Sequence, residues 1–131
     1  MTKTFPFSKK LWVYTNFDCN LRCAYCVAES HPRAPRRGIN FETFKRIVDE
    51  AMVLGVDRIY LTGGEPFILD DIFDMLAYSS DKLPTTILTN GMLFNDRRFN
   101  RLIEIKNEAL IIQVSLDGSR PELHDPIRGL G

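Results

Sequence analysis

Three cysteines are the residues of this sequence best suited to chemistry. Cys19, Cys23 and Cys26 are all of the cysteines in the chain, and they lie together in the segment 19–26. A disulfide framework would need an even number of cysteines spread along the chain. This cluster is therefore typical of metal or redox chemistry in a reducing compartment. The spacing is C-x3-C-x2-C.

The spacing alone leaves the metal open. A zinc ion in a closed tetrahedral site would need a fourth ligand, which His31 could supply. An iron–sulfur cubane normally takes four thiolates, so three thiolates would leave one iron with an open position. A protein without any metal is the third alternative.

Short apolar runs alternate with amphipathic segments along the chain. The runs are rich in β-branched and aromatic residues and predict buried strands at 11–14, 59–61, 85–89 and 110–116. Apolar residues at helical spacing predict three helices between the strands. The first begins after Asn40 and ends at Gly55, the second spans about 71–79, and the third begins near 95 or 96. We expect the third helix to bury Phe99, Leu102 and Ile103.

This order of elements predicts an α/β fold in which helices cover a parallel sheet. Each strand is followed by a polar or glycine-rich segment, at 19–26, 63–66, 89–91 and 115–118. In parallel α/β folds the active site lies at the carboxyl ends of the strands. We therefore expect these four segments to meet at one site.

The same segments resemble the motifs of the radical S-adenosylmethionine (radical SAM) enzymes. The cysteines, with Tyr25 before the third, resemble the signature C-x3-C-x-aromatic-C. Segment 63–66 is similar to the family's GGEP motif and segment 89–91 to its TNG motif. Segments 115–118 and 124–129 are similar to S-x-D-G and H-D-x-x-R-G in members that modify peptides or build cofactors. The motifs occur in the family's order and cover nearly the whole chain.

The resemblance implies that Cys19, Cys23 and Cys26 hold a [4Fe-4S] cluster whose open iron binds S-adenosylmethionine. The reduced cluster would cleave this cofactor to methionine and a 5′-deoxyadenosyl radical. That radical would abstract hydrogen from a peptide or cofactor-precursor substrate. An electron donor such as flavodoxin or ferredoxin is implied as well.

The resemblance also implies roles for residues around the cluster. Gly63 and Gly64 would let the backbone approach the cofactor, and Glu65 would offset the methionine ammonium group. Ser115 would bond a ribose hydroxyl, and Arg128 would pair with the methionine carboxylate. The remaining cofactor-binding residues would be Asn90 and, near the adenine, Tyr25.

Other residues have an ordinary structural interpretation. His124 is typical of a structural or capping histidine. Three arginines in a loop rich in proline predict a solvated face: Arg33, Arg36 and Arg37. Three aromatic residues predict packing at the base of a barrel: Phe5, Phe7 and Trp12.

The family's core is a partial (β/α)6 TIM-like barrel, and this sequence resembles its first half. Residues 1–131 would form one incomplete domain with three βα units and a fourth strand. The fifth and sixth strands and the auxiliary-cluster cysteines have no counterpart here. We expect the chain to belong to a longer enzyme, or to be completed by self-association or a partner at the fourth-strand edge. The alternative is a non-catalytic zinc- or cluster-binding module that assembles with a partner chain.

Composition excludes several other classes of protein. The 131 residues include 17 Lys and Arg against 17 Asp and Glu, so no net charge would attract nucleic acid or an anionic membrane. The apolar runs are far shorter than the ~20 residues that span a bilayer. The amino-terminal segment lacks the apolar stretch of a secretory signal. We expect a cytoplasmic protein.

Overall fold

Four parallel strands form the frame of the molecule, and the computed structural model describes residues 8–129. The strands are β1 (Lys10–Tyr14), β2 (Arg58–Thr62), β3 (Thr85–Thr89) and β4 (Leu110–Val114). The helices are α1 (Phe41–Val53), α2 (Ile72–Lys82), α3 (Asp96–Glu104) and α4 (Pro121–Arg128), with a short 3-10 helix, η1 (Pro66–Ile68).

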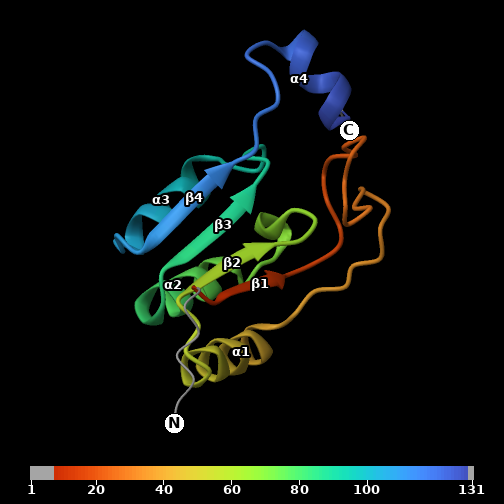
Figure 1. Ribbon diagram of the computed structural model, residues 1–131. Helices are drawn as coiled ribbons and strands as arrows, with labels where there is room; N and C mark the ends of the chain where they lie inside the picture. Colours follow the sequence, from red (N-terminus) through yellow and green to blue (C-terminus); the bar gives the residue numbers. More distant parts are fainter. Residues whose placement is uncertain (1–7, 130–131) are drawn as a thin grey trace.

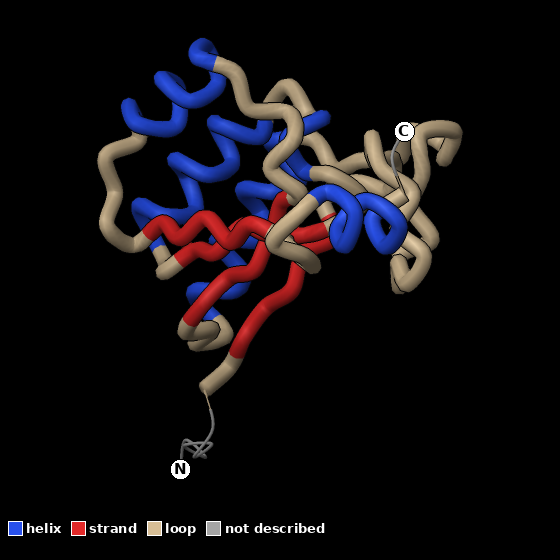
Figure 2. The backbone as a smooth tube through the Cα atoms, turned by 90° about the horizontal axis from the view of Figure 1, so that it is seen from above, coloured by secondary structure: helices blue, strands red, loops and turns tan. Residues whose placement is uncertain are grey.

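The strands lie in the sheet in the order of the sequence, β1-β2-β3-β4, and every neighbouring pair is parallel. Each crossover therefore proceeds in the same direction, and right-handed crossovers place the connecting helices on one face. Figures 1 and 2 show α1, α2 and α3 on this face, whereas α4 lies apart, beyond the carboxyl ends of the strands. This is the predicted α/β fold of successive βα units.

The core lies between the sheet and α1 and α2. Ile59 and Leu61 of β2 and Ile87 of β3 point into it and are fully buried. They meet the apolar faces of the helices, of which Phe44 and Leu76 are also fully buried. Burial of apolar surface on this side of the sheet supplies the main favourable contribution to folding.

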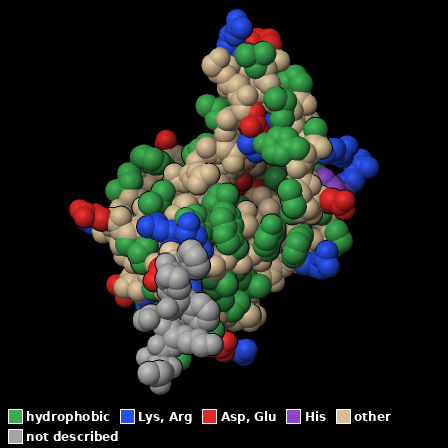
Figure 3. Space-filling model, viewed as in Figure 1, with side chains coloured by type: hydrophobic (Ala, Val, Ile, Leu, Met, Phe, Trp, Pro, Cys, Tyr) green, Lys and Arg blue, Asp and Glu red, His purple; other side chains and the backbone are tan. Residues whose placement is uncertain are grey.

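The opposite face of the sheet carries large side chains that remain accessible. Trp12 of β1 stacks on its register partner Tyr60 of β2, with ring centroids 4.4 Å apart. Trp12 is 51% exposed, and Figure 3 shows apolar side chains at the surface over the strands. Trp12 lies on the face of the sheet opposite the helices, which is the inner face of a TIM-like barrel, so its packing at the base of a barrel stays a prediction. Phe5 and Phe7 lie outside the described residues.

Two helix caps confirm the predicted starting points. The Asn40 side chain accepts a hydrogen bond from the Thr43 amide at 2.8 Å, and the Asn95 side chain accepts one from the Arg98 amide at 2.9 Å. Gly55 follows the end of α1 with a φ of +68°, as expected for a glycine after a helix.

The last third of the chain departs from the predictions. β4 ends at Val114, not at 116. Phe99 and Ile103 of α3, predicted to be buried, are 55% and 53% exposed. Of these three residues, only Leu102 packs against the core. Phe99 and Ile103 lie on the side of α3 that no described element covers. α4 was not anticipated, since Pro126 lies inside it.

None of the helices within residues 8–129 combines the length and the hydropathy needed to cross a membrane.

We predict that Leu76→Ala lowers the free energy of unfolding by about 2–5 kcal/mol, because it leaves a cavity beneath the sheet. Chemical denaturation measures this loss. The matched control is Val53→Ala in α1, a side chain that is 88% exposed. It should change the free energy by less than about 0.5 kcal/mol. Equal losses in the two variants would show that the core is not where we place it.

Candidate functional site

The cysteine loop leaves the carboxyl end of β1 and is fixed there by buried Asn16. The Asn16 side-chain amide donates to the carbonyl and carboxylate oxygens of Asp18, at 2.9 and 3.0 Å, and to the Glu65 carbonyl at 3.1 Å. Its oxygen accepts a hydrogen bond from the Thr15 hydroxyl at 2.9 Å. Asn16 therefore joins the start of the loop to the segment that follows β2.

Gly64 lies directly against the same part of the chain. A Cβ atom at this position would be 1.9 Å from the Asp18 carbonyl oxygen. The Gly64 amide donates to the Asn16 carbonyl at 2.9 Å, and the Glu65 amide donates to the Asp18 carbonyl at 3.0 Å. Because glycine has no side chain, the segment after β2 can pair closely with the backbone of residues 16–18.

The Glu65 carboxylate is buried and joins the ends of β2 and β3. One oxygen accepts hydrogen bonds from the Thr89 hydroxyl at 2.7 Å and the Phe67 amide at 3.1 Å. The other oxygen accepts from the Asn90 amide at 2.8 Å. Burial raises the pKa of the Glu65 carboxyl above its ordinary value, and these hydrogen bonds oppose that shift.

A pocket of about 150 Å³ lies where the four strand ends meet. Every residue predicted for the site lines it except Tyr25 and Cys26: the pocket is bordered by Cys19, Cys23, Gly63, Gly64, Glu65, Asn90, Ser115 and Arg128. Segments from all four strand ends therefore converge, as the sequence predicted.

Cys26 lies on the other side of the loop. It lines a separate depression together with Cys23, Ser30 and His31. Cys23 borders both spaces, so the loop forms the wall between them.

Each of the three sulfur atoms has an N–H donor. The Leu21 amide donates to Cys19 Sγ at 3.4 Å, and the Ser30 amide donates to Cys26 Sγ at 3.3 Å. The Arg128 guanidinium is 3.9 Å from Cys23 Sγ. Such donors stabilise negative charge on sulfur. The loop is therefore suited to three thiolates, a donor set that would leave one iron of a cubane with an open position.

Two further observations bear on what the cysteines hold. The Ser30 hydroxyl is the one buried side-chain polar atom without a hydrogen-bond partner among the described residues, and it follows Cys26 closely. No three His, Cys, Asp or Glu side chains in residues 8–129 are grouped around a point as ligands of one ion. A cubane takes each thiolate on a different iron, so the three sulfur atoms do not need to converge on one point.

Burial raises the pKa of the Cys19 thiol, and a bound metal would reverse this shift.

His31, considered as a fourth zinc ligand, is engaged within its own loop. Its Nδ1 accepts a hydrogen bond from the Arg33 amide at 3.1 Å, and its carbonyl accepts one from the Cys19 amide at 3.4 Å. Arg33, Arg36 and Arg37 are exposed, as predicted for a solvated loop face.

Tyr25 does not line the pocket but contacts Asp117 and Arg128, of which Arg128 borders it. Its hydroxyl donates to Asp117 at 2.6 Å, and Arg128 Nε donates to the same carboxylate oxygen. The Arg128 guanidinium also lies over the Tyr25 ring, 5.4 Å from the centroid. Hydrogen bonds from Tyr25 and Arg128 lower the pKa of Asp117. The hydrogen bond between Tyr25 and Asp117 raises the pKa of Tyr25. His124 is structural, as predicted: its Nδ1 accepts from the Asp117 amide at 3.1 Å.

Sequence reasoning missed several residues of this site. Asn16 and Thr89 act through buried hydrogen bonds, and Asn20 accepts a hydrogen bond from the Asn90 side chain at 2.8 Å. Asp117 was noted only as part of a motif. A polar pair directly after an apolar strand, as Thr15 and Asn16 are after β1, was the available signal.

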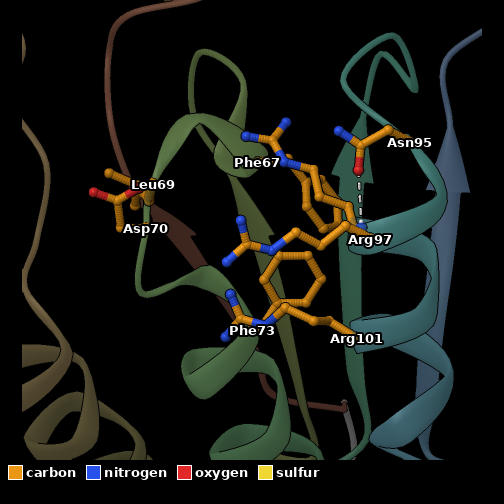
Figure 4. A pocket seen from close by; sticks show the side chains of 8 residues that line it. Phe67, Leu69, Asp70, Phe73, Asn95, Arg97 and Arg101 are labelled. Carbon is orange, nitrogen blue, oxygen red and sulfur yellow. Dashed lines mark hydrogen bonds between the residues drawn. The ribbon is translucent and has the colours of Figure 1, made fainter.

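Another pocket, of about 290 Å³, lies between η1, α2 and the start of α3 and is bordered by arginines (Figure 4). Arg98 donates to the Leu93 carbonyl at 2.8 Å, and Arg101 lies 4.3 Å from the centroid of the Phe73 ring. None of the cysteines lines this pocket. It is therefore separate from the candidate site.

We predict that Gly64→Ala lowers the free energy of unfolding by about 2–4 kcal/mol, because the new Cβ forces the paired segments apart and breaks their hydrogen bonds. Chemical denaturation provides the measurement. The control is Gly55→Ala, where only conformational strain of about 1–2 kcal/mol is expected and no backbone lies in the way. A smaller loss at Gly64 than at Gly55 would contradict the close pairing.

We also predict a pH dependence that arises from Glu65. Because its pKa is raised by folding, the folded chain binds this proton more tightly than the unfolded chain. The contribution is therefore fully present below the ordinary carboxyl pKa and is lost as pH rises through the folded pKa. Relative to Glu65→Gln, the wild type should lose free energy of unfolding as pH rises above the ordinary carboxyl pKa of about 4. Glu50→Gln on exposed α1 is the control, and no such difference should accompany it. A difference of the opposite sign at Glu65 would contradict the buried, desolvated carboxylate.

Comparisons with known proteins agree with this site. The radical SAM superfamily domain matches residues 13–131. The chain is 35% identical over 112 residues to the antilisterial bacteriocin subtilosin biosynthesis protein AlbA of Bacillus subtilis (strain 168), covering 85% of this chain and 25% of AlbA. It is 30% identical over 121 residues to the mycofactocin maturase MftC of Mycolicibacterium smegmatis, covering 92% and 30%.

Among solved structures, Streptococcus suis SuiB bound to S-adenosylmethionine superposes with a TM-score of 0.81 at 27% identity. The match covers 95% of this chain and 28% of SuiB. The chain thus spans about a quarter to a third of the length of these relatives. The predicted first half of a TIM-like barrel is confirmed by this superposition. The chain belongs to the radical SAM superfamily.

Proposed function

We propose that this chain is the cofactor-binding part of a peptide-modifying radical SAM enzyme. One observation carries the proposal: a single pocket brings two of the three cysteines together with the ends of β2, β3 and β4. Members of this superfamily are enzymes that bind a [4Fe-4S] cluster and S-adenosylmethionine. When bound, these groups would supply a carbon radical that removes hydrogen from the substrate.

Each side chain of the pocket has a task in this proposal. Cys19, Cys23 and Cys26 hold the cluster as thiolates, and their N–H donors stabilise the negative charge. Glu65 keeps a negative charge beneath the pocket, where it offsets the ammonium group of the cofactor. Its own oxygens are already fixed by three hydrogen bonds, so the charge is preorganised and its position does not depend on the ligand.

The remaining residues would orient the cofactor. Gly63 and Gly64 expose backbone at the pocket wall, and Ser115 presents a hydroxyl to the ribose from the end of β4. Arg128 lines the same pocket and would pair with the methionine carboxylate. The Asn90 side-chain amide donates a hydrogen bond to Asn20 and lies 3.8 Å from Cys19 Sγ. Tyr25 would lie near the adenine at the rim.

A peptide substrate is supported by two relatives. AlbA takes part in the biosynthesis of a bacteriocin, and SuiB has been solved bound to its precursor peptide SuiA, a structure that superposes on this chain with a TM-score of 0.77. The exposed aromatic side chains of Trp12 and Tyr14, with half-buried Tyr60 stacked on Trp12, lie on the open face of the sheet. Such a surface suits an extended chain with apolar side chains.

The sheet edge suggests that this part does not act alone. Within residues 8–129, β4 pairs with β3 only, and Ile111 and Val114 are 47% and 54% exposed. We propose that further strands of a longer enzyme, or a partner chain, pair with this edge. An electron donor such as flavodoxin or ferredoxin would reduce the cluster. The three free thiols suit the reducing cytoplasm.

The test is anaerobic reconstitution with iron and sulfide, followed by electron paramagnetic resonance of the reduced protein with and without S-adenosylmethionine. We expect a cluster signal that shifts when the cofactor is added, because an open iron becomes coordinated. Cys26→Ser should abolish the signal, since the remaining thiolates cannot bind three irons. Ala24→Ser, an exposed change in the same loop that leaves every thiol in place, should keep it.

Other results would decide against the proposal. A cluster signal that does not change when S-adenosylmethionine is added would show that this chain forms the cluster but does not bind the cofactor. A colourless protein that retains zinc would favour the alternative of a non-catalytic metal-binding module.

A further inference from the structure

The end of α4 is paired with the cysteine loop through the backbone, although the two are about a hundred residues apart. The Ala24 amide donates to the Ile127 carbonyl at 2.9 Å, and the Arg22 amide donates to the Gly129 carbonyl at 3.4 Å. Gly129 has a φ of +64°, and a Cβ there would be 2.1 Å from the Arg22 carbonyl oxygen. Figure 1 shows α4 ending beside this loop, away from the other helices.

Two side chains strengthen the same contact. Asp117 follows β4 and accepts hydrogen bonds from Tyr25, which belongs to the loop, and from Arg128, which ends α4. The Arg128 side chain is 13% exposed and the Asp117 side chain 28%, so the pair is partly shielded from water. Charged hydrogen bonds in such places fix geometry more firmly than surface ion pairs.

Asp117 determines where the guanidinium of Arg128 can lie. Nε is committed to the carboxylate, and the planar fork then directs Nη1 toward Cys23 Sγ, 3.9 Å away. Leu21 and Ser30 supply the corresponding donors to Cys19 and Cys26 from rigid backbone. Cys23 has no such backbone donor among the described residues: its donor is the Arg128 side chain, which Asp117 positions.

We propose that Asp117 is a positioning residue. It holds Arg128 against Cys23 and ties the cysteine loop to α4, so that the loop keeps the shape in which its sulfur atoms receive their donors. This inference rests on the proposed function, because it assigns Cys23 to the cluster. A hydrogen bond to a cluster sulfur raises the reduction potential. Asp117 therefore acts on the cluster through Arg128 and not by its own charge.

The sign of a potential shift separates these two modes of action. In Asp117→Ala, loss of the donor at Cys23 should move the midpoint potential of the reconstituted cluster to a more negative value. If Asp117 acted only as a nearby negative charge, its removal would move the potential to a more positive value. Arg128→Lys keeps the charge but loses the fork, so it should also give a more negative potential. A redox titration followed by electron paramagnetic resonance measures all three proteins.

A second measurement needs no cluster. Amide hydrogen exchange at Ala24, followed by nuclear magnetic resonance in the metal-free chain, reports directly on the hydrogen bond to Ile127. We expect exchange about tenfold faster in Asp117→Ala, with the amides of β2 and β3 unchanged. Glu122→Ala removes a carboxylate from exposed α4 and is the matched control, for which no change is expected.

The two measurements test the proposed function and the role of Asp117 separately. A wild-type chain that takes up no cluster contradicts the proposed function, and the exchange at Ala24 then still decides whether Asp117 holds the loop. Unchanged exchange at Ala24 in Asp117→Ala overturns the inference. So does a more positive potential in that variant.

Discussion

The structure depends on one buried polar link at the carboxyl edge of the sheet. Asn16 and Glu65 lie next to one another in the interior, and between them they bond to the segments that follow β1, β2 and β3. Buried polar groups are costly unless every donor and acceptor is paired, and here the pairing is nearly complete. The cost of an alternative arrangement is therefore high. The link fixes where the cysteine loop begins and where the pocket lies.

The candidate site could be predicted well because its parts follow strands directly. Cys19, Gly63, Asn90 and Ser115 each come just after an apolar run, and parallel strands bring such positions to one edge without further information. What the sequence could not show is the direction of each side chain. The bonds of Glu65 within the chain and the pairing of Tyr25 with Asp117 depend on packing among distant segments.

The elements that were misjudged are those with few partners. Apolar spacing in α3 predicts a buried face, yet burial requires a neighbouring element, and Phe99 and Ile103 remain more than half exposed. α4 is short and contains a proline, so its propensity is weak. Its place is set by contacts with the cysteine loop.

The strand order has a consequence for how the chain folds. Neighbouring strands are also neighbours in sequence, so the sheet can grow through local closures, each costing little chain entropy. The pairing of Arg22 and Ala24 with the end of α4 is the exception, because it closes a loop of nearly the whole chain. We therefore expect the sheet to form first and the cysteine loop to stay open until α4 arrives. The thiols would remain accessible to incoming iron during that interval.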